Sequence, residues 1–476
     1  MAVPDSARPR PLPTSASYGI TVRLYAKPSA SVVGMLATAV GHAGGLVTAI
    51  DVSESRADRI TVDVSCSAVN GEHAAEIVET LRAVDGVTVH RVSDRTFLLH
   101  IGGKISVESK VPLRTRDDLS MAYTPGVGRV SLALAEHPED VAKLTIKGNA
   151  VAVVTDGSAV LGLGNIGPGA ALPVMEGKAA LFKRFANIDA WPICLDTQDT
   201  DEIVRIVRGI SPGFGGINLE DISAPRCFEI ERRLREELDI PVFHDDQHGT
   251  AIVVLAALTN ALRCVTKSLD QVRIVVAGGG AAGTAIVTLL LAAGAAHVLV
   301  WDREGILAPS DPALSPAKRS LAAMTNSAGV TGDLHDALRG ADVFIGVSAP
   351  GVLPAEWIGD MGGSPIVFAL ANPDPETDVD AAQQIAAVLA TGRSDYPNQI
   401  NNVLAFPGVF RGLLDARANE VSTAMLLSAA EALAACVSDE QLNATYIVPS
   451  VFDPNVPTAV AAAVQQAAHA TSSGAK

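Results

Sequence analysis

A glycine-rich turn between two apolar segments constrains the fold of this chain more than any other feature. The turn runs from Ala277 to Gly283, after a β-branched run at 272–276 and before an apolar helical stretch at 284–294. Glycines allow a tight turn and close approach of a ligand to the backbone, and the amides at a helix N-terminus attract phosphate. The segment therefore predicts a strand-turn-helix unit that binds the pyrophosphate of a dinucleotide.

The surrounding residues fit this interpretation. Five residues form the expected phosphate-binding turn: Gly278, Gly280, Ala281, Ala282 and Gly283. The next strand, at 297–301, is closed by Asp302, about 20 residues beyond the turn, where a carboxylate accepts hydrogen bonds from ribose hydroxyls. Later apolar runs at 343–347 and 366–369 extend the pattern. The third part of the chain is therefore predicted to be a doubly wound α/β domain of Rossmann type.

The choice between NAD and NADP depends on the end of that second strand. Asp302 favours a free ribose 2′-hydroxyl and hence NAD. Arg303 follows directly and could face a 2′-phosphate, so NADP remains open. We expect NAD.

Two pairs of adjacent carboxylates, Glu220-Asp221 and Asp245-Asp246, precede the glycine turn. Hard divalent cations such as Mg²⁺ and Mn²⁺ prefer oxygen ligands of this kind. Neighbouring carboxylates are also common as solvated surface groups or helix caps, so either pair alone indicates little. Beside a nicotinamide, however, a metal suggests oxidation of a hydroxy acid whose oxygens the metal can bind.

Composition argues against several other classes of protein. The net charge of −16 disfavours binding to nucleic acid, which requires clustered Lys and Arg. The five cysteines are scattered and form no CxxC pair, so the expected location is a reducing cytoplasm without disulfides or zinc sites. Residues 1–13 lack the apolar region of a signal peptide. The stretch 284–300 contains Gly294 and His297, and a helix followed by a strand explains it better than a membrane span does.

The chain divides into three blocks and two tails. We expect a disordered tail at 1–17, domains at 18–100, 101–240 and 241–470 (the last with a terminal helix at 457–468), and a loose tail at 471–476. The first domain is predicted to have strands at 20–25, 46–53, 59–65 and 87–93 and helices at 30–41 and 73–84. This βαββαβ order is ferredoxin-like. It resembles an ACT domain, a regulatory module that binds amino acids between paired copies; a dimerisation module without a ligand has nearly equal weight.

The second domain contains two candidate residues. Tyr123 stands beside a Pro-Gly turn, where a tyrosine most often has a packing role. Lys178, on a helix expected at 173–185, is flanked by small and apolar residues. Desolvation there would lower the pKa of the ammonium towards the range of a general base. The alternative is a lysine on the exposed side of an amphipathic helix. The loop 162–167 has GxGxxG spacing, but Pro168 follows it directly, so we interpret it as a flexible substrate loop.

Seven ordered motifs then reveal a resemblance that covers residues from about 105 to 460. They are AYTPGVG at 122–128, TDGSAVLGLGNIG at 155–167, EGKAALFKRFA at 176–186, INLEDI at 217–222, PVFHDDQHGTA at 241–251, FALANPDPE at 368–376 and NNVLAFPGV at 401–409. With them the chain resembles the bacterial short-form malic enzymes, with an added ACT-like domain. The resemblance implies an α/β substrate domain ahead of the NAD(P)-binding domain. It also implies oxidative decarboxylation of (S)-malate to pyruvate and CO₂ with Mg²⁺ or Mn²⁺.

Site residues follow from the resemblance, motif by motif. It implies Glu220, Asp221 and Asp246 as metal ligands, with Asp245 supporting the proton network beside them. Lys178 would take the proton of the C2 hydroxyl. The metal would then stabilise the enolate left when CO₂ departs.

The resemblance also assigns groups that contact the substrate and cofactor. Tyr123 would protonate C3 of enolpyruvate. Asn372 and Asn402 would hold the substrate, and Asn372 also the nicotinamide ribose. Ala159 stands where larger relatives carry an arginine that binds a malate carboxylate, so the group that binds this carboxylate is open.

Two alternatives to a malic enzyme remain. The same residues could serve a malolactic or oxaloacetate-decarboxylating enzyme, or the fold could carry a ligand sensor without catalysis, although retention of Lys178, Tyr123 and the carboxylates argues against the sensor. The resemblance further suggests a homodimer or a higher homo-oligomer. A small-molecule effector at the ACT-like domain is also expected, and no membrane partner.

Overall fold

The computed structural model describes residues 14–474. The chain forms two compact units, Met1–Ser106 and Val107–Lys476. No helix in the described part of the chain is long and apolar enough to span a membrane.

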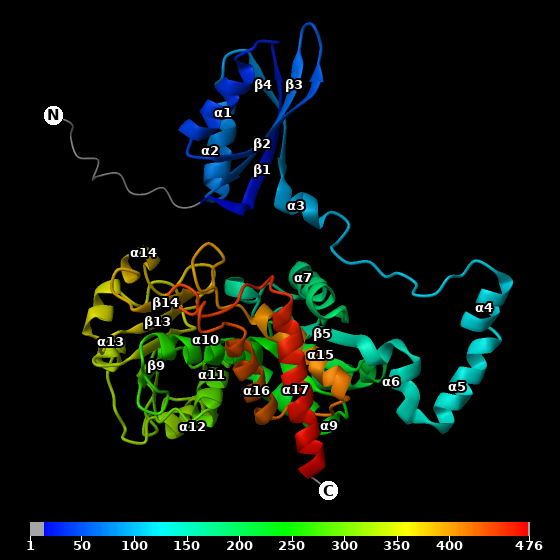
Figure 1. Ribbon diagram of the computed structural model, residues 1–476, viewed down its shortest axis with the longest axis vertical. Helices are drawn as coiled ribbons and strands as arrows, with labels where there is room; N and C mark the ends of the chain where they lie inside the picture. Colours follow the sequence, from blue (N-terminus) through cyan, green and yellow to red (C-terminus); the bar gives the residue numbers. More distant parts are fainter. Residues whose placement is uncertain (1–13, 475–476) are drawn as a thin grey trace. The chain divides into compact units, whose positions relative to one another are not determined.

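The first unit has the predicted βαββαβ order. Its elements are β1 (Ser15–Ala26), α1 (Val32–His42), β2 (Leu46–Ser55), β3 (Ile60–Ala68), α2 (Gly71–Arg82) and β4 (Val87–Asp94), followed by the short helix α3 (Arg95–His100). The four strands form an antiparallel sheet in the order β2-β3-β1-β4, and α1 and α2 lie on one face of it (Figure 1). Alternate residues of β1, among them Val22 and Leu24, are fully buried against these helices.

The expected disordered tail at 1–17 needs one correction. Residues 1–13 lie outside the described residues, but Ser15–Ser17 belong to β1. Ser15 pairs with Ala68 across the sheet, ahead of an irregularity before Gly19. Pairing with a partner strand therefore extends β1 beyond the apolar pattern that is visible in the sequence.

The second unit begins with short helices. They are α4 (Arg116–Ala122), α5 (Gly126–Glu136), η1 (Pro138–Asp140), α6 (Val141–Leu144) and η2 (Ile146–Asn149). We call α4 and α5 together the arm, residues 116–136. In Figure 1 the arm extends away from the sheets of its own unit, and α4 packs against α5.

A parallel sheet in the order β6-β5-β7-β8 follows. Its strands are β5 (Ala150–Thr155), β6 (Asp189–Cys194), β7 (Gly216–Leu219) and β8 (Val242–His244). The segments between and after them are η3 (Leu161–Leu163), α7 (Pro168–Ala186), α8 (Thr200–Ile210), η4 (Ser211–Gly213), α9 (Arg226–Glu237), the π-helical turn η5 (Asp245–Gly249) and α10 (Thr250–Cys264). Helix α7 begins earlier than the predicted position 173, because Pro168 occupies its first turn, where the missing N–H costs nothing.

A second sheet has the order β11-β10-β9-β12-β13-β14, parallel except for the edge strand β11. Its strands are β9 (Arg273–Ala277), β10 (His297–Asp302), β11 (Gly305–Ile306), β12 (Val343–Gly346), β13 (Ile366–Ala369) and β14 (Val388–Thr391). They are linked by α11 (Ala281–Ala292), α12 (Pro316–Thr325), α13 (Leu334–Leu338), η6 (Ala355–Asp360) and α14 (Val379–Ala382). The strand order reverses between β9 and β12, which confirms the predicted doubly wound sheet.

The chain ends with η7 (Asn402–Leu404), α15 (Phe406–Ala416), α16 (Thr423–Ala435) and α17 (Asn455–Gly474). Helix α17 is longer than the predicted helix at 457–468, so the expected loose tail at 471–476 is wrong for residues 471–474; residues 475–476 lie outside the described part.

One hydrophobic core joins both parallel sheets. It includes Val151 and Val153 of β5, most of α10, and Val276 of β9. Phe182 of α7 packs edge-on against Phe406, with the ring centroids 4.7 Å apart. The expected second and third domains therefore share their interior.

Candidate active site

The three predicted metal ligands lie at the carboxyl ends of two neighbouring strands. Glu220 and Asp221 directly follow β7, and Asp246 follows β8. Because β7 and β8 are parallel neighbours, their ends meet at one edge of the sheet. The structure brings one carboxylate oxygen of each residue within 4.8 Å of the others. This spacing fits a single divalent cation.

Backbone contacts hold Asp221 in an uncommon conformation. Its φ is +53°, its N–H donates to Asp246 Oδ2 at 2.8 Å, and its carbonyl accepts from the N–H of Ala159 at 2.9 Å. Asn218 donates to Glu220 Oε2 at 2.8 Å. Among the described residues, no hydrogen-bond partner reaches the buried Asp221 Oδ2. An oriented, unsatisfied carboxylate oxygen of this kind is what a metal ligand requires.

Repulsion between the carboxylates also destabilises their ionised forms. Burial and the neighbouring Asp246 and Glu220 raise the pKa of Asp221 to about 8. The pKa of Glu220 is raised by burial and Asp246, although Lys178 opposes this, and burial also raises the pKa of Asp246. Three crowded carboxylates with raised pKa values are stabilised in their charged form by a bound cation. The donor set therefore fits Mg²⁺ or Mn²⁺.

Lys178 lies against this cluster. Its side chain is only 8% exposed, and its Nζ lies 2.9 Å from Glu220 Oε1 and donates a hydrogen bond to Asp245 Oδ2. Asn402 donates to the same Asp245 oxygen at 2.5 Å. The ammonium also lies 4.1 Å from the centre of the Phe406 ring. Lys178, Asp245 and Asn402 were predicted from distant motifs, and the structure brings them together.

The predicted direction of the Lys178 pKa shift is wrong for this arrangement. Burial does lower the pKa, as expected, but the negative charges of Asp245 and Glu220 outweigh burial and raise it. The flanking residues along α7 indicated an apolar environment, whereas residues far away in the sequence supply the nearest charges. Lys178 is therefore held as an ammonium in the arrangement described.

Tyr123 does not join the other site residues within the chain. It caps the end of α4, and its side chain is 68% exposed. The hydrogen bonds described for it are made by its backbone, to Leu119 and from Val127, both on the arm. In a single chain, Tyr123 is thus an arm residue, and the predicted proton donor to C3 is not at the site.

The glycine turn fits a pyrophosphate. Gly278 has φ of +119°, and a Cβ there would lie 2.5 Å from the carbonyl oxygen of Val347. A Cβ on Gly283 would lie 1.8 Å from the carbonyl oxygen of Gly278, so both positions require glycine. A Cβ on Gly280 would meet no atom within 4 Å, which leaves open space at the N-terminus of α11, beside Ala281 and Ala282.

Two carboxylates lie beside the glycine turn, where the adenosine of a dinucleotide is expected, and both pair with a lysine. Asp302 Oδ2 accepts from the N–H of Gly279 at 3.0 Å. Lys318 of α12 lies 3.1 Å from Asp302 and 2.8 Å from Glu304. Sequence reasoning found Asp302 but not Lys318, because α12 contacts β10 only after the chain has folded.

Asn372 follows β13 on the other side of the turn. Its carbonyl oxygen would lie 2.2 Å from a Cβ on Gly162. The loop that was expected to approach substrate therefore packs its backbone against the segment that carries Asn372. The side chain of Asn372 is exposed and makes one long hydrogen bond, of 3.5 Å, to the carbonyl of Leu370.

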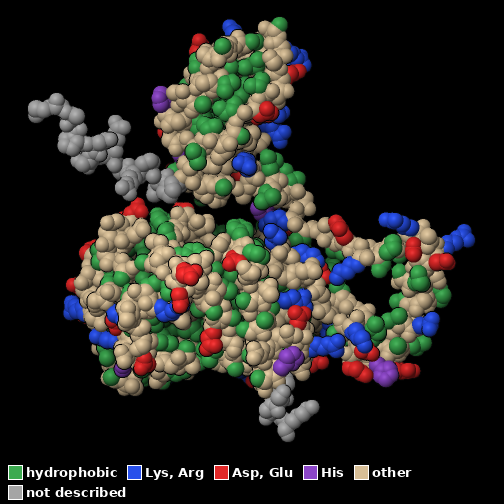
Figure 2. Space-filling view, in the orientation of Figure 1, with side chains coloured by type: hydrophobic (Ala, Val, Ile, Leu, Met, Phe, Trp, Pro, Cys, Tyr) green, Lys and Arg blue, Asp and Glu red, His purple; other side chains and the backbone are tan. Residues whose placement is uncertain are grey.

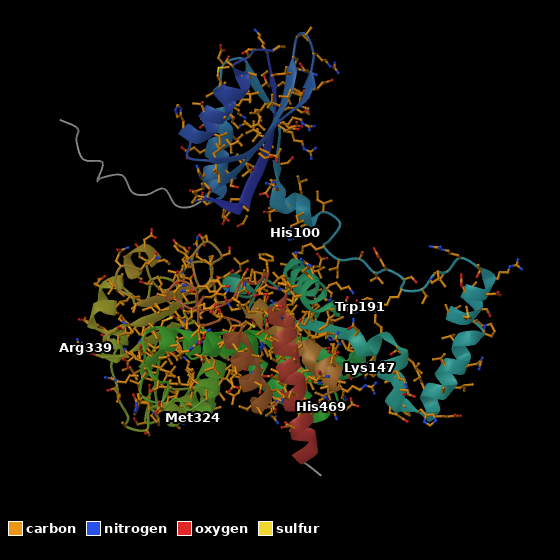
Figure 3. All side chains as sticks on the ribbon, viewed as in Figure 1. His100, Lys147, Trp191, Met324, Arg339 and His469 are labelled. Carbon is orange, nitrogen blue, oxygen red and sulfur yellow. The ribbon has the colours of Figure 1, made fainter. Side chains whose placement is uncertain are left out.

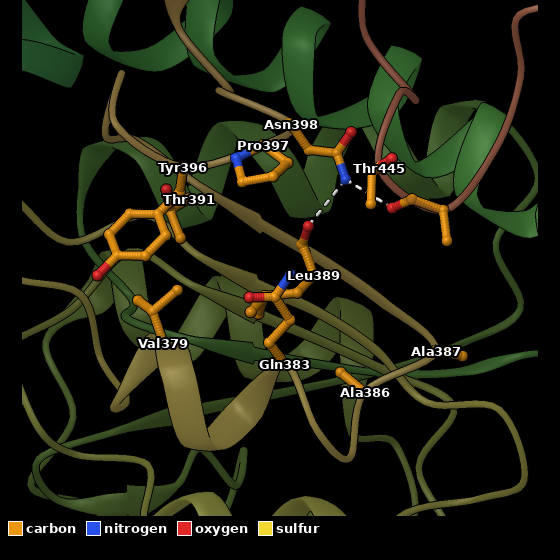
Figure 4. A pocket seen from close by; sticks show the side chains of 11 residues that line it. Val379, Gln383, Ala386, Ala387, Leu389, Thr391, Tyr396, Pro397, Asn398 and Thr445 are labelled. Carbon is orange, nitrogen blue, oxygen red and sulfur yellow. Dashed lines mark hydrogen bonds between the residues drawn. The ribbon is translucent and has the colours of Figure 1, made fainter. Parts of the chain in front are cut away.

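A separate cavity of about 160 Å³ lies beside β14 (Figure 4). Its walls come from α14, from β14 and from residues 396–398 and 444–445. Its polar groups are neutral, and Asn398 uses its amide to bind the carbonyls of Leu389 and Ala444. None of the predicted site residues lines it.

Comparison with known proteins identifies relatives over almost the whole chain. The family model "Malic enzyme, N-terminal domain" matches residues 102–235, and "Malic enzyme, NAD binding domain" matches residues 247–469. An NAD-dependent malic enzyme of Geobacillus stearothermophilus is 55% identical over 97% of this chain and 96% of its own. A bifunctional malic/malolactic enzyme of Bacillus subtilis is 52% identical over 78% of this chain and 90% of its own. The crystal structure of an NAD-dependent malic enzyme from Thermotoga maritima covers 78% of this chain and 99% of its own, with 50% identity and a TM-score of 0.75.

Proposed function

This chain belongs to the malic enzyme family, and from that membership we infer that it oxidises malate with NAD and decarboxylates the product to pyruvate and CO₂. One observation supports placing this reaction at the carboxylate cluster. Lys178 contacts Asp245 and Glu220 at the edge of the sheet where the carboxylates converge. A buried basic group, an oriented acid and a cation-binding cluster are the parts that oxidation of a hydroxy acid needs.

The proposed roles follow from these contacts. Glu220, Asp221 and Asp246 would hold Mg²⁺ or Mn²⁺, which as a Lewis acid polarises the substrate's C2 oxygen and stabilises negative charge on it. Lys178, once neutral, would accept the proton of the C2 hydroxyl at Nζ. Asp245 orients that amine, and Asn402 orients Asp245 through the 2.5 Å hydrogen bond. Burial of Lys178 excludes bulk water from the proton path.

We propose NAD rather than NADP as the cofactor. Asp302 presents its carboxylate beside Gly279, where the adenosine ribose of a dinucleotide would lie, and Glu304 adds a second negative charge nearby. Both charges would repel a 2′-phosphate. Two cations support NADP, the exposed Arg303 and Lys318, but both carboxylates already neutralise Lys318.

We further propose that the active form is a homodimer in which the arm binds a second copy of this chain. The arm exposes large apolar side chains, including Met121 and Leu132 at 69% each. Hydrophobic side chains are visible on the surface of the arm in Figure 2, and side chains project from α4 and α5 in Figure 3. Leu161 and Leu163, beside the site in the loop before α7, are also about two-thirds exposed. Burying these two surfaces against each other would bring Tyr123 of one copy towards the site of the other and remove apolar area from water.

The first unit is proposed to be an ACT-like regulatory domain. Its antiparallel βαββαβ sheet supports this, as does its position ahead of the catalytic unit, within the region aligned with the Geobacillus relative.

The test is an activity assay of the whole chain. Malate and Mn²⁺ are supplied with NAD or with NADP, absorbance at 340 nm is followed, and pyruvate and lactate are then measured. The proposal requires reduced NAD and pyruvate in equal amounts. Lactate formed without net reduced cofactor would replace this function with the malolactic reaction, which the name of the Bacillus relative makes the second candidate. Pyruvate formed faster with NADP would overturn the cofactor assignment alone.

A further inference from the structure

Glu376, the last residue of the motif at 368–376, is buried at the cofactor side of the second unit. Its side chain is completely inaccessible to solvent. Among the residues described, no ion pair neutralises it. It is bound instead by backbone: Oε1 accepts from the N–H of Ser348 at 2.9 Å, and Oε2 accepts from the N–H of Ala371 at 2.9 Å. Burial raises the pKa of Glu376, and these two N–H groups oppose that rise.

The two donors belong to different strands. Ser348 follows β12 and Ala371 follows β13, so one carboxylate links the carboxyl ends of two parallel neighbours. The backbone carbonyl of Glu376 also accepts from Leu353 at 2.8 Å. A Cβ on Gly346 would lie 2.4 Å from Glu376 Cδ, so the glycine at the end of β12 provides the space for the carboxyl group.

Both linked segments border the expected dinucleotide site. Val347, next to Ser348, contacts Gly278 of the phosphate-binding turn, and its N–H donates to Ala277 at 2.9 Å. Asn372 follows Ala371 directly. The sheet order places β10, with Asp302, on one side of β9 and places β12 and β13 on the other. A dinucleotide that binds its adenosine beside Asp302 therefore extends its nicotinamide half towards Ser348 and Asn372.

We propose that Glu376 is a positioning residue for the nicotinamide half of the dinucleotide, because it fixes the two backbone segments between which that half binds. The inference rests on the proposed use of NAD. It predicts that Glu376 affects NAD but not the adenosine end of the site, since Gly280, Asp302 and Lys318 make no described contact with it.

The test compares the affinity of two ligands. Glu376→Gln keeps the shape of the side chain but turns one acceptor into an NH₂ donor that faces a backbone N–H. Glu376→Asp keeps the charge but shortens the reach. Isothermal titration calorimetry with NAD and with ADP is performed on the full chain, for the wild type and both variants. We expect NAD binding to weaken about tenfold or more in both variants, with ADP binding within about twofold of the wild type. The KM for NAD should rise more than the KM for malate.

A matched control is Glu356→Gln, which makes the same change of a carboxylate to an amide at an exposed position on η6. It should bind NAD like the wild type. Unchanged NAD binding in Glu376→Asp, or equal weakening of NAD and ADP, would overturn the positioning role. If Glu376→Gln does not fold, the Asp variant decides. Wild-type chain that binds NAD but does not oxidise malate would contradict the proposed function and leave this inference standing.

Discussion

At the scale of single residues, the site is defined by contacts between groups that are distant in sequence. Lys178 meets Asp245, 67 positions away, and Asn402 meets the same carboxylate from 157 positions away. The motifs identified each of these residues, but only the fold shows that they share one oxygen atom. The predicted direction of the Lys178 pKa shift is wrong for the same reason, because the charges that decide it are on Glu220 and Asp245, which follow β7 and β8.

Substitution of Lys178 by alanine tests the proton transfer. The change removes the proposed base, so malate oxidation should fall by about 10²–10⁴-fold. Binding of Mn²⁺ and NAD should persist, since neither set of proposed ligands includes the lysine. Calorimetric titrations with both ligands, beside the 340 nm assay, provide the measurement.

Lys183→Ala is the matched control on the same helix. Lys183 is half-exposed and pairs with Asp189 at 2.8 Å, an ion pair worth about 1 kcal/mol or less. Its activity should stay close to that of the wild type. Near-normal turnover in Lys178→Ala would contradict the assignment of Lys178 as the general base.

At the scale of elements, the long apolar patterns predicted the strands well and the helix ends less well. Strands β9 and β10 lie where the apolar runs beside the glycine turn predict them, whereas α11 begins at Ala281 and ends at Ala292, ahead of the predicted helix at 284–294. The predicted start of α7 at 173 is wrong, because the helix begins at Pro168, directly after the loop 162–167, and proline is favoured in a first helical turn. Strand β8 has three residues, too few for periodicity to reveal it.

The motifs indicated a role for the arm through Tyr123. They could not indicate the partner that the arm binds. If the arm binds a second copy, Tyr123 and Lys178 of one site come from different chains. Co-expression of Tyr123→Phe with Lys178→Ala would then restore activity, because one of the two sites in each mixed dimer carries both native residues. Activity of purified mixed dimers, separated by two affinity tags, is the measurement.

Each variant expressed alone serves as the control and should be nearly inactive. Mixed dimers as inactive as the separate variants would show that Tyr123 acts within its own chain, or not at all. Leu132→Asp, which places a charge on the exposed face of α5, should shift the protein towards a monomer in sedimentation experiments.

At the scale of the whole molecule, the chain combines a small unit and a large one. The sequence predicted the element order of the first unit, and the structure shows it. The ligand of that unit could not be predicted, because an effector site between paired copies depends on an assembly that one sequence does not specify.

Deletion of residues 1–100 tests the regulatory proposal. The remaining chain retains both parallel sheets and their core, so basal malate oxidation should persist within about threefold of the intact protein. Amino acids and other small metabolites that change the rate of the full chain should have no effect on the shortened one. An effector response that survives the deletion unchanged would place regulation elsewhere.

The shared core of the large unit limits the chimeras that can be made between members of this family. The first family model ends at residue 235 and the second begins at residue 247, so a chimera could be joined between these two positions. Yet Val151 and Phe182 from the first part pack in the same interior as α10, β9 and α15 from the second. A hybrid with a relative's second part would place mismatched side chains across this interior, where even one methylene of misfit is felt. The family models therefore mark segments of sequence that are not interchangeable modules.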